Sequence, residues 1–257
     1  MTNATGMRFV DKVALVTGGS TGIGLASARG FAREGARVMI AARRRAEGEA
    51  AVAGIVADGG DAAFVETDVT DSDSVRAMVA ACVDRFGRLD IAYNNAGITG
   101  IVTTDIAEAD EAMFDRVMAI NVRGVWLSMK YEIRAMLAAG GGAIVNCSSF
   151  AGLRGGTKSS AYYASKHAVL GMTKTVSLEY AARNIRVNAV CPGLIMTDLI
   201  TTGFADAQDK LAMLTGRIPM QRPGQPEEVA DAVLWLASSQ SSFVNGIALP
   251  VDGATSV

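Results

Sequence analysis

Short apolar runs alternate with helical patterns along the whole chain. Runs of roughly four to eight apolar, β-branched residues bounded by glycine predict buried strands, and apolar residues spaced three and four apart predict helices. Strands are expected on this basis at 12–17, 37–42, 62–66, 89–93, 143–147, 185–190 and 246–249. Helices are expected at 25–34, 47–56, 71–86, 108–137 and 226–237, with a further helix that carries Tyr162 and ends near 182.

The alternation of strands and helices predicts an α/β fold, with a doubly wound, mainly parallel sheet covered by helices on both faces. No shift in composition divides the chain, so a single domain over 1–257 is expected. Within it, residues 1–9 are expected to form an N-terminal tail, and the mixed stretch 194–217 to form a mobile flap over the substrate. Asn121 carries a propensity cost inside the 108–137 helix, which indicates a kink or a functional site there.

Composition and charge argue against several classes of function. Hydrophobic residues make up 50% of the chain and charged residues 19%, which suits a large core. The net charge of −2 argues against nucleic-acid partners, and we expect neither a signal peptide nor a membrane span. Cys82, Cys147 and Cys191 are widely spaced and odd in number, which predicts reduced thiols in a cytoplasmic protein. A single histidine without a Cys-x-x-Cys predicts no metal site.

A glycine-rich segment joins the first predicted strand to the first predicted helix. It reads Gly18-Gly-Ser-Thr-Gly22-Ile-Gly24. Glycines permit a tight turn and a close approach of the backbone to a pyrophosphate, and the helix N-terminus supplies free N–H groups and the positive end of its dipole. The segment therefore predicts a dinucleotide site, with a purely structural glycine turn as the alternative.

The second predicted strand ends on an arginine run, Ala42-Arg43-Arg44-Arg45. In dinucleotide-binding folds, a carboxylate near this point binds the ribose 2′-OH of NAD, whereas an arginine accommodates the 2′-phosphate of NADP. After the end of this strand no carboxylate occurs before Glu47, so the charges favour NADP and leave NAD as the alternative. In the other interpretation, the arginines only solvate the start of a helix.

Tyr162 and Lys166 are four residues apart on a predicted helix. Residues at this spacing lie on one helix face, so the phenol and the ammonium are neighbours. A nearby positive charge favours the ionised phenol, which makes the tyrosine a usable general acid or base. The pair alone is weak evidence for a catalytic site, because both residues are common on solvated helix faces.

Together these motifs resemble the short-chain dehydrogenase/reductase family over essentially the whole chain after Phe9. The matching elements, in order, are Thr17-Gly18-x-x-x-Gly22-x-Gly24, Asp68, Asn94-Asn95-Ala96-Gly97, Asn121, Ser149, Tyr162-x-x-x-Lys166 and Pro192-Gly193. Each element is weak alone, but their order and spacing are specific. Ala254 is a departure, because a second glycine often follows Asp252-Gly253 in this family.

The resemblance implies a Rossmann-like sheet of seven strands in the order 3-2-1-4-5-6-7. It implies an oxidoreductase that transfers hydride between NADP(H), or alternatively NAD(H), and a small ketone or secondary alcohol, commonly as a homotetramer. A nucleotide-binding protein without catalysis is the distant alternative.

The resemblance also implies the roles of individual residues. Tyr162 would be the general acid/base, Ser149 would bind the substrate oxygen, Lys166 would hold the nicotinamide ribose, and Asn121 would position a proton-relay water. The cofactor would be bound by Gly18, Ser20, Thr21, Gly22, Ile23, Gly24, Arg43, Asp68, Val69, Asn95, Ala96, Gly97, Tyr162, Lys166, Pro192, Gly193, Ile195 and Thr197.

Overall fold

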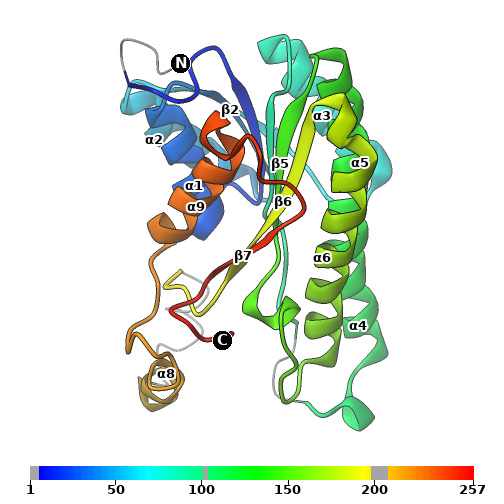
Figure 1. Ribbon diagram of the computed structural model, residues 1–257, viewed down its shortest axis with the longest axis vertical. Coiled ribbons are helices and arrows are strands. Elements are labelled where there is room, and N and C mark those ends of the chain that lie inside the picture. The colour runs from blue at the N-terminus through cyan, green and yellow to red at the C-terminus, as the bar shows by residue number, and fades with distance from the viewer. Residues whose placement is uncertain (1–5, 101–103, 198–207) are drawn as a thin grey trace.

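A single sheet with helices on both faces organises the protein (Figure 1). The computed structural model describes residues 6–100, 104–197 and 208–257. Part of the expected tail (1–5) and part of the expected flap (198–207) therefore lie outside the described residues. The strands are β1 (Val13–Thr17), β2 (Arg37–Ala42), β3 (Asp61–Glu66), β4 (Ile91–Asn94), β5 (Gly142–Cys147), β6 (Ile185–Pro192) and β7 (Ala248–Val251).

The strand order is β3-β2-β1-β4-β5-β6-β7, and all the pairings are parallel, which confirms the predicted topology. The α-helices are α1 (Gly22–Arg33), α2 (Arg45–Ala57), α3 (Ser72–Phe86), α4 (Glu111–Met118), α5 (Gly124–Ala138), α6 (Ser160–Tyr180), α8 (Gln208–Thr215) and α9 (Pro226–Ala237). Helices α1, α2 and α9 cover one face, and α3, α5 and α6 cover the other (Figure 1). In the described part of the chain, no helix has the length and apolarity needed to cross a bilayer.

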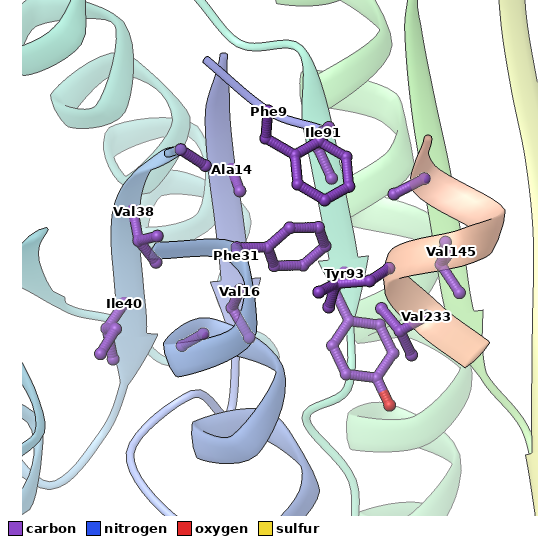
Figure 2. Close-up of a cluster of buried hydrophobic side chains, with 14 of the residues drawn as sticks. Phe9, Ala14, Val16, Phe31, Val38, Ile40, Ile91, Tyr93, Val145 and Val233 are labelled. Carbon is purple, nitrogen blue, oxygen red and sulfur yellow. The ribbon is translucent and has the colours of Figure 1, made fainter. Parts of the chain in front are cut away.

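The sheet separates two hydrophobic clusters, because successive side chains of a strand point to opposite faces. In β1, Ala14 and Val16 face the cluster beneath α1 and α9, whereas Val13 and Leu15 face the cluster beneath α3 and α5. Every residue of this strand is buried, as expected for the centre of a parallel sheet. The first cluster also contains Phe9, which belongs to the expected tail (Figure 2).

Phe9 is fixed to the body of the protein rather than extending from it. Its ring meets that of Phe31 edge to face, with 5.2 Å between the ring centroids, and its backbone N–H donates to the carbonyl of Glu34. Arg8, next to it, forms an ion pair with the side chain of Glu34. This anchor could not be predicted from the sequence, because a single aromatic residue before a strand has no periodic pattern.

The expected helix over 108–137 is interrupted. A 3₁₀ turn at Ile106–Glu108 precedes α4, and a π-helical turn at Ala119–Arg123 separates α4 from α5. Asn121 lies in this wider turn, as the propensity cost indicated. Gly124 is the first residue after this turn, and a Cβ there would lie 2.9 Å from Val69 Cγ2, so glycine lets α5 pass close to the segment after β3. Since π-helical turns are frequent at functional sites, this interruption directs attention to Asn121.

Two boundaries differ from expectation because of glycine. Helix α1 begins at Gly22, inside the glycine segment, and not at Leu25. The last strand is displaced from 246–249 to β7, because Gly246 adopts a left-handed backbone (φ +76°) and donates its N–H to the carbonyl of Val187 before the strand starts.

The backbone at Ala254 has a conformation that favours glycine. Its φ of +69° lies in the left-handed region, where a Cβ costs roughly 1–2 kcal/mol. Replacing Ala254 by glycine removes this strain but increases the freedom of the unfolded chain. The substitution should therefore raise the free energy of unfolding by up to about 1 kcal/mol in urea denaturation.

A matched control is Ala50→Gly, in the exposed part of α2, which should lower the free energy of unfolding by about 1 kcal/mol. Destabilisation of both variants to the same extent would contradict a strained backbone at Ala254.

Candidate active site

A cavity of about 420 Å³ opens at the carboxyl edge of the sheet. The segments that follow β1 to β6 all contribute to its walls, because parallel strands present their carboxyl ends at one edge. The predicted site residues that line it are Gly18, Ser20, Thr21, Gly22, Ile23, Arg43, Asp68, Val69, Asn95, Ala96, Gly97, Ser149, Tyr162, Lys166, Pro192, Gly193, Ile195 and Thr197. The lining does not include Gly24 or Asn121, which lie behind the wall.

The glycine segment after β1 forms a cradle of backbone. Gly18 and Gly22 adopt left-handed backbones, with φ of +62° and +53°. Gly24 supports them from below, because a Cβ there would lie 2.2 Å from the carbonyl oxygen of Gly18 and 2.6 Å from Asn95 Nδ2. No side chain fits at this position without displacing the backbone, so Gly24 shapes the cradle without touching the cavity.

The N-terminus of α1 is free to receive an anion. The side chain of its N-cap residue, Thr21, makes no capping hydrogen bond, and the first turn carries no acidic residue. The positive end of the helix dipole and the first backbone N–H groups therefore face the cavity without an internal anion. This arrangement fits a phosphate group.

Thr17 joins the cradle to the segment after β4. Its Oγ1 accepts hydrogen bonds from the backbone N–H groups of Asn95 (3.1 Å) and Ala96 (3.2 Å). Asn95 Nδ2 donates in turn to the carbonyl of Gly18 at 3.1 Å. The sequence motif includes Thr17 but does not indicate this role. Its position, as the last residue of a buried strand before a glycine, was the feature from which the role could have been inferred.

The arginine run divides into two paired residues and one available residue. Arg44 forms an ion pair with Glu47 (2.8 Å), and Arg45 with Glu66 (3.0 Å). Arg43 makes no ion pair with any residue that the structure describes, and it lies exposed at the cavity wall. Of the three arginines, Arg43 is therefore the one that combines a place in the cavity wall with a guanidinium outside these ion pairs.

Asp68 lies across this end of the cavity from the glycine cradle. Hydrogen bonds from the backbone N–H (2.9 Å) and hydroxyl (2.8 Å) of Thr70 reach Asp68 Oδ1. The backbone bond is the largest cause that lowers the pKa of Asp68, and the charge of Arg43 adds to it. The carboxylate is therefore held as an acceptor close to Arg43.

Tyr162 and Lys166 lie on one face of α6, as their spacing predicted. The ammonium of Lys166 is 5.5 Å from the centroid of the Tyr162 ring, and its Nζ donates to the carbonyl of Cys147 at 2.9 Å. Lys166 is only 6% exposed, so this carbonyl provides a buried charge with a partner. Tyr163 packs edge to face on Phe150 and is not among the residues that line the cavity, which leaves Tyr162 as the phenol at the site.

Ser149 and Ser148 follow β5 and have different surroundings. Ser149 caps a 3₁₀ turn at Phe150–Gly152, and its Oγ accepts the N–H of Ala151 at 3.1 Å while it lines the cavity. Ser148 Oγ donates to the carbonyl of Lys166 at 2.9 Å and so ties β5 to α6. Sequence reasoning missed this supporting role, because nothing in the pair of serines distinguishes one from the other.

Asn121 ties the segment after β4 to α6. Its Nδ2 donates to the carbonyl of Ile98 (2.8 Å) and to Ser165 Oγ (3.0 Å), and its Oδ1 accepts the N–H of Ile98 (2.9 Å). Ser165 Oγ donates onward to the carbonyl of Tyr162 at 2.7 Å. The side chain thus acts on Tyr162 through Ser165, and its expected part in holding a relay water stays a prediction.

Comparisons with known proteins agree with this geometry. A family model described as enoyl-(acyl carrier protein) reductase matches residues 18–255. The A-factor type gamma-butyrolactone 1'-reductase (1S-forming) of Streptomyces virginiae is 43% identical over 262 residues, with 100% of both chains covered. The cis-4-hydroxycyclohexanecarboxylate dehydrogenase of Sinomonas cyclohexanicum is 45% identical, with 96% of this chain and 98% of that protein covered.

A solved structure of actinorhodin polyketide ketoreductase with NADPH superposes with a TM-score of 0.90 at 36% identity, over 95% of this chain and 97% of that chain. These proteins are dehydrogenases and reductases of alcohols and ketones, and the similarity extends over nearly the full length of each. The chain therefore belongs to the short-chain dehydrogenase/reductase family of nicotinamide-dependent oxidoreductases.

Proposed function

We propose that this protein transfers hydride between NADP(H) and a small ketone or secondary alcohol, with Tyr162 as the general acid/base. One observation carries the proposal. Ser149, Tyr162 and Lys166, which come from two different segments, line the same cavity as the glycine cradle and Arg43. Proton transfer groups and an anion-binding cradle at one sheet edge are what nicotinamide chemistry requires of a protein.

The residues of the cavity fit an NADP molecule. Its pyrophosphate would be held by the glycine cradle and the N-terminus of α1, and its 2′-phosphate would be accepted by the unpaired Arg43. Asp68 and Val69 would lie beside the adenine, Asn95 beside a ribose, and Ile195 and Thr197 beside the carboxamide. The related ketoreductase, whose structure holds NADPH, supports this choice over NAD. When bound, the nicotinamide supplies or accepts the hydride.

The chain's own residues would handle the proton. In the direction of reduction, the carbonyl carbon of the substrate gains hydride, and its oxygen takes the phenolic proton of Tyr162 to become a hydroxyl. Ser149 Oγ would donate a hydrogen bond to that oxygen while charge develops on it. The ammonium of Lys166, 5.5 Å from the ring, would stabilise the tyrosinate that remains. In the direction of oxidation, the tyrosinate would take the hydroxyl proton back.

Substitution of Tyr162 by phenylalanine tests the proton donor. The variant keeps the ring but loses the hydroxyl, so kcat/KM should fall by at least about 10²-fold, whereas the dissociation constant of NADPH should stay within about twofold. Turnover is measured with a panel of cyclic and acyclic ketones, and binding by NADPH fluorescence. Tyr163→Phe is the matched control and should keep its turnover. A fully active Tyr162→Phe variant would refute the mechanism.

Substitution of Arg43 by aspartate tests the phosphate contact. A charge-assisted hydrogen bond contributes roughly 1.5–3 kcal/mol, so the affinity for NADPH should fall about 10- to 100-fold while the affinity for NADH is kept or improved. Arg45→Asp makes the same change of charge at a residue outside the cavity and should leave the ratio of the two affinities unchanged. Equal losses in the two variants would mean that only overall charge matters.

We also propose that the protein forms a homotetramer. Exposed apolar side chains support association, among them Trp126 on α5 and Leu178 on α6, which is 82% exposed. Light scattering at micromolar concentration should give about four times the chain mass of 26.7 kDa. A mass equal to that of one chain would contradict this proposal.

A further inference from the structure

Glu132 carries a buried carboxyl group that takes no part in the proposed reaction. It lies on α5 and is fully buried, with an exposed fraction of 0%. Its Oε2 accepts a hydrogen bond from Asn94 Nδ2 at 3.0 Å, and among the described residues its Oε1 has no hydrogen-bond partner. An unpaired carboxylate in such a place is costly, so the group either takes a proton or finds a partner.

The carboxyl group of Glu132 is one end of a buried network of hydrogen-bonded polar side chains. Asn94 Nδ2 also donates to Asn146 Oδ1 at 3.1 Å, and Asn146 Nδ2 donates to Thr173 Oγ1 at 3.0 Å. The four residues Glu132, Asn94, Asn146 and Thr173 belong to α5, β4, β5 and α6, and all are at most 1% exposed. These hydrogen bonds therefore join the two central strands to the two helices on one face of the sheet.

Two residues of this hydrogen-bonded network directly precede residues of the candidate active site. Asn94 comes before Asn95, which holds the glycine cradle through the carbonyl of Gly18. Asn146 comes before Cys147, whose carbonyl receives the ammonium of Lys166. A displacement of either amide would move the end of β4 or β5, and with it a contact of the cofactor cradle or of Lys166.

The surroundings of Glu132 favour the protonated acid. Burial raises the pKa of Glu132 to about 8, and the hydrogen bond from Asn94 lowers it only in part. From α3, the titratable group facing it is the thiol of Cys82, whose pKa burial raises to about 12, so it is neutral as well. The neighbouring strands present the uncharged amides of Asn94 and Asn146, and in the described chain no cation contributes to the pKa of Glu132.

A proton on Glu132 would also provide a donor for a nearby acceptor that lacks one. Asn94 Oδ1 is buried and, among the described residues, has no donor. In the protonated acid, Oε2 of Glu132 accepts the hydrogen bond from Asn94 Nδ2, and Oε1 carries the hydrogen. This O–H can donate to Asn94 Oδ1, directly or through a buried water. A carboxylate would instead leave two acceptors without donors in the interior.

We propose that Glu132 is a positioning residue that, as the neutral acid, holds Asn94 and Asn146 and thereby fixes the ends of β4 and β5 beneath the cofactor cradle and Lys166. Ionisation of Glu132 loosens this anchor in alkaline solution. The effects on turnover and on NADPH affinity rest on the proposed function, whereas the effect on stability does not.

The sign of the pH effect follows from linkage. Because the pKa of Glu132 is raised in the folded protein relative to the unfolded chain, the folded state binds more protons between the two values. The stabilising contribution of Glu132 is complete below the pKa of the unfolded chain and is lost as the pH rises through about 8. Glutamine keeps an acceptor and adds a donor but does not ionise, so Glu132→Gln should imitate the neutral acid without this loss.

Thermal unfolding of Glu132→Gln and wild type from about pH 5 to about pH 9 tests the ionisation. The Tm of wild type minus that of the variant should decrease steadily with pH and become constant above about 8. Glu179→Gln, which removes an exposed carboxyl group from α6, is the matched control and should run parallel to wild type. A Glu132→Gln profile parallel to wild type would overturn the proposal.

Nucleotide binding then separates positioning from simple filling of the core. Glu132→Leu retains apolar volume but cannot hold Asn94, so its NADPH dissociation constant should rise about tenfold or more at pH 7, and Glu132→Gln should restore it to within about threefold of wild type. Wild-type affinity in the leucine variant would overturn the positioning role. If the leucine variant does not fold, the pH profile of Tm and the NADPH affinity of Glu132→Gln test the proposal instead. The thermal readout needs neither turnover nor nucleotide, so it remains decisive if the protein proves not to bind NADPH.

Discussion

The hydrogen bond from the buried ammonium of Lys166 to the carbonyl of Cys147 is the interaction on which the active-site geometry depends. A charge that is 6% exposed must have a partner, and the carbonyl at the end of β5 provides it. The contact fixes how far α6 is displaced along its axis relative to β5. It therefore also fixes the position of Tyr162, one helical turn before Lys166. Ser148, whose hydroxyl donates to the carbonyl of Lys166, strengthens the same junction from the strand side.

The cofactor end of the cavity is held by hydrogen bonds of the same kind between strand ends. Thr17 and Asn95 join β1 to the segment after β4, and Gly24 leaves room for this close approach. The proposed Glu132 anchor lies beneath both ends. The site is thus a set of short segments whose positions are fixed by buried polar contacts between neighbouring parallel strands, whereas Arg43 lies exposed at the cavity wall, outside this set of contacts.

Much of the fold could be predicted from the sequence, because buried parallel strands and amphipathic helices have strong periodic patterns. The glycine cradle and the pair Tyr162 and Lys166 could be located for the same reason, since their chemistry depends on local spacing. The strand order and the roles of Ser149 and Asn121 came from the family resemblance, because contacts between distant segments have no local pattern.

The features that sequence reasoning missed depend on tertiary contacts. The sequence indicated only a kink or a functional site at Asn121, and the π-helical turn itself lies where the Asn121 side chain binds the backbone of Ile98. Phe9 is buried in a cluster of residues from distant parts of the chain, where its ring meets that of Phe31. Glu132 reads as an ordinary helix residue until the fold places it against Asn94, so its unusual state could not be inferred from composition or spacing.

The most direct test of the central claim is a fluorescence titration of the purified protein with NADPH and NADH side by side. The claim is that the carboxyl edge of this sheet is an NADP site, completed by the unpaired Arg43 beside Tyr162 and Lys166. It predicts that NADPH binds at least about tenfold more tightly than NADH, as expected for one additional charge-assisted phosphate contact. Equal affinities, or tighter binding of NADH, would contradict it.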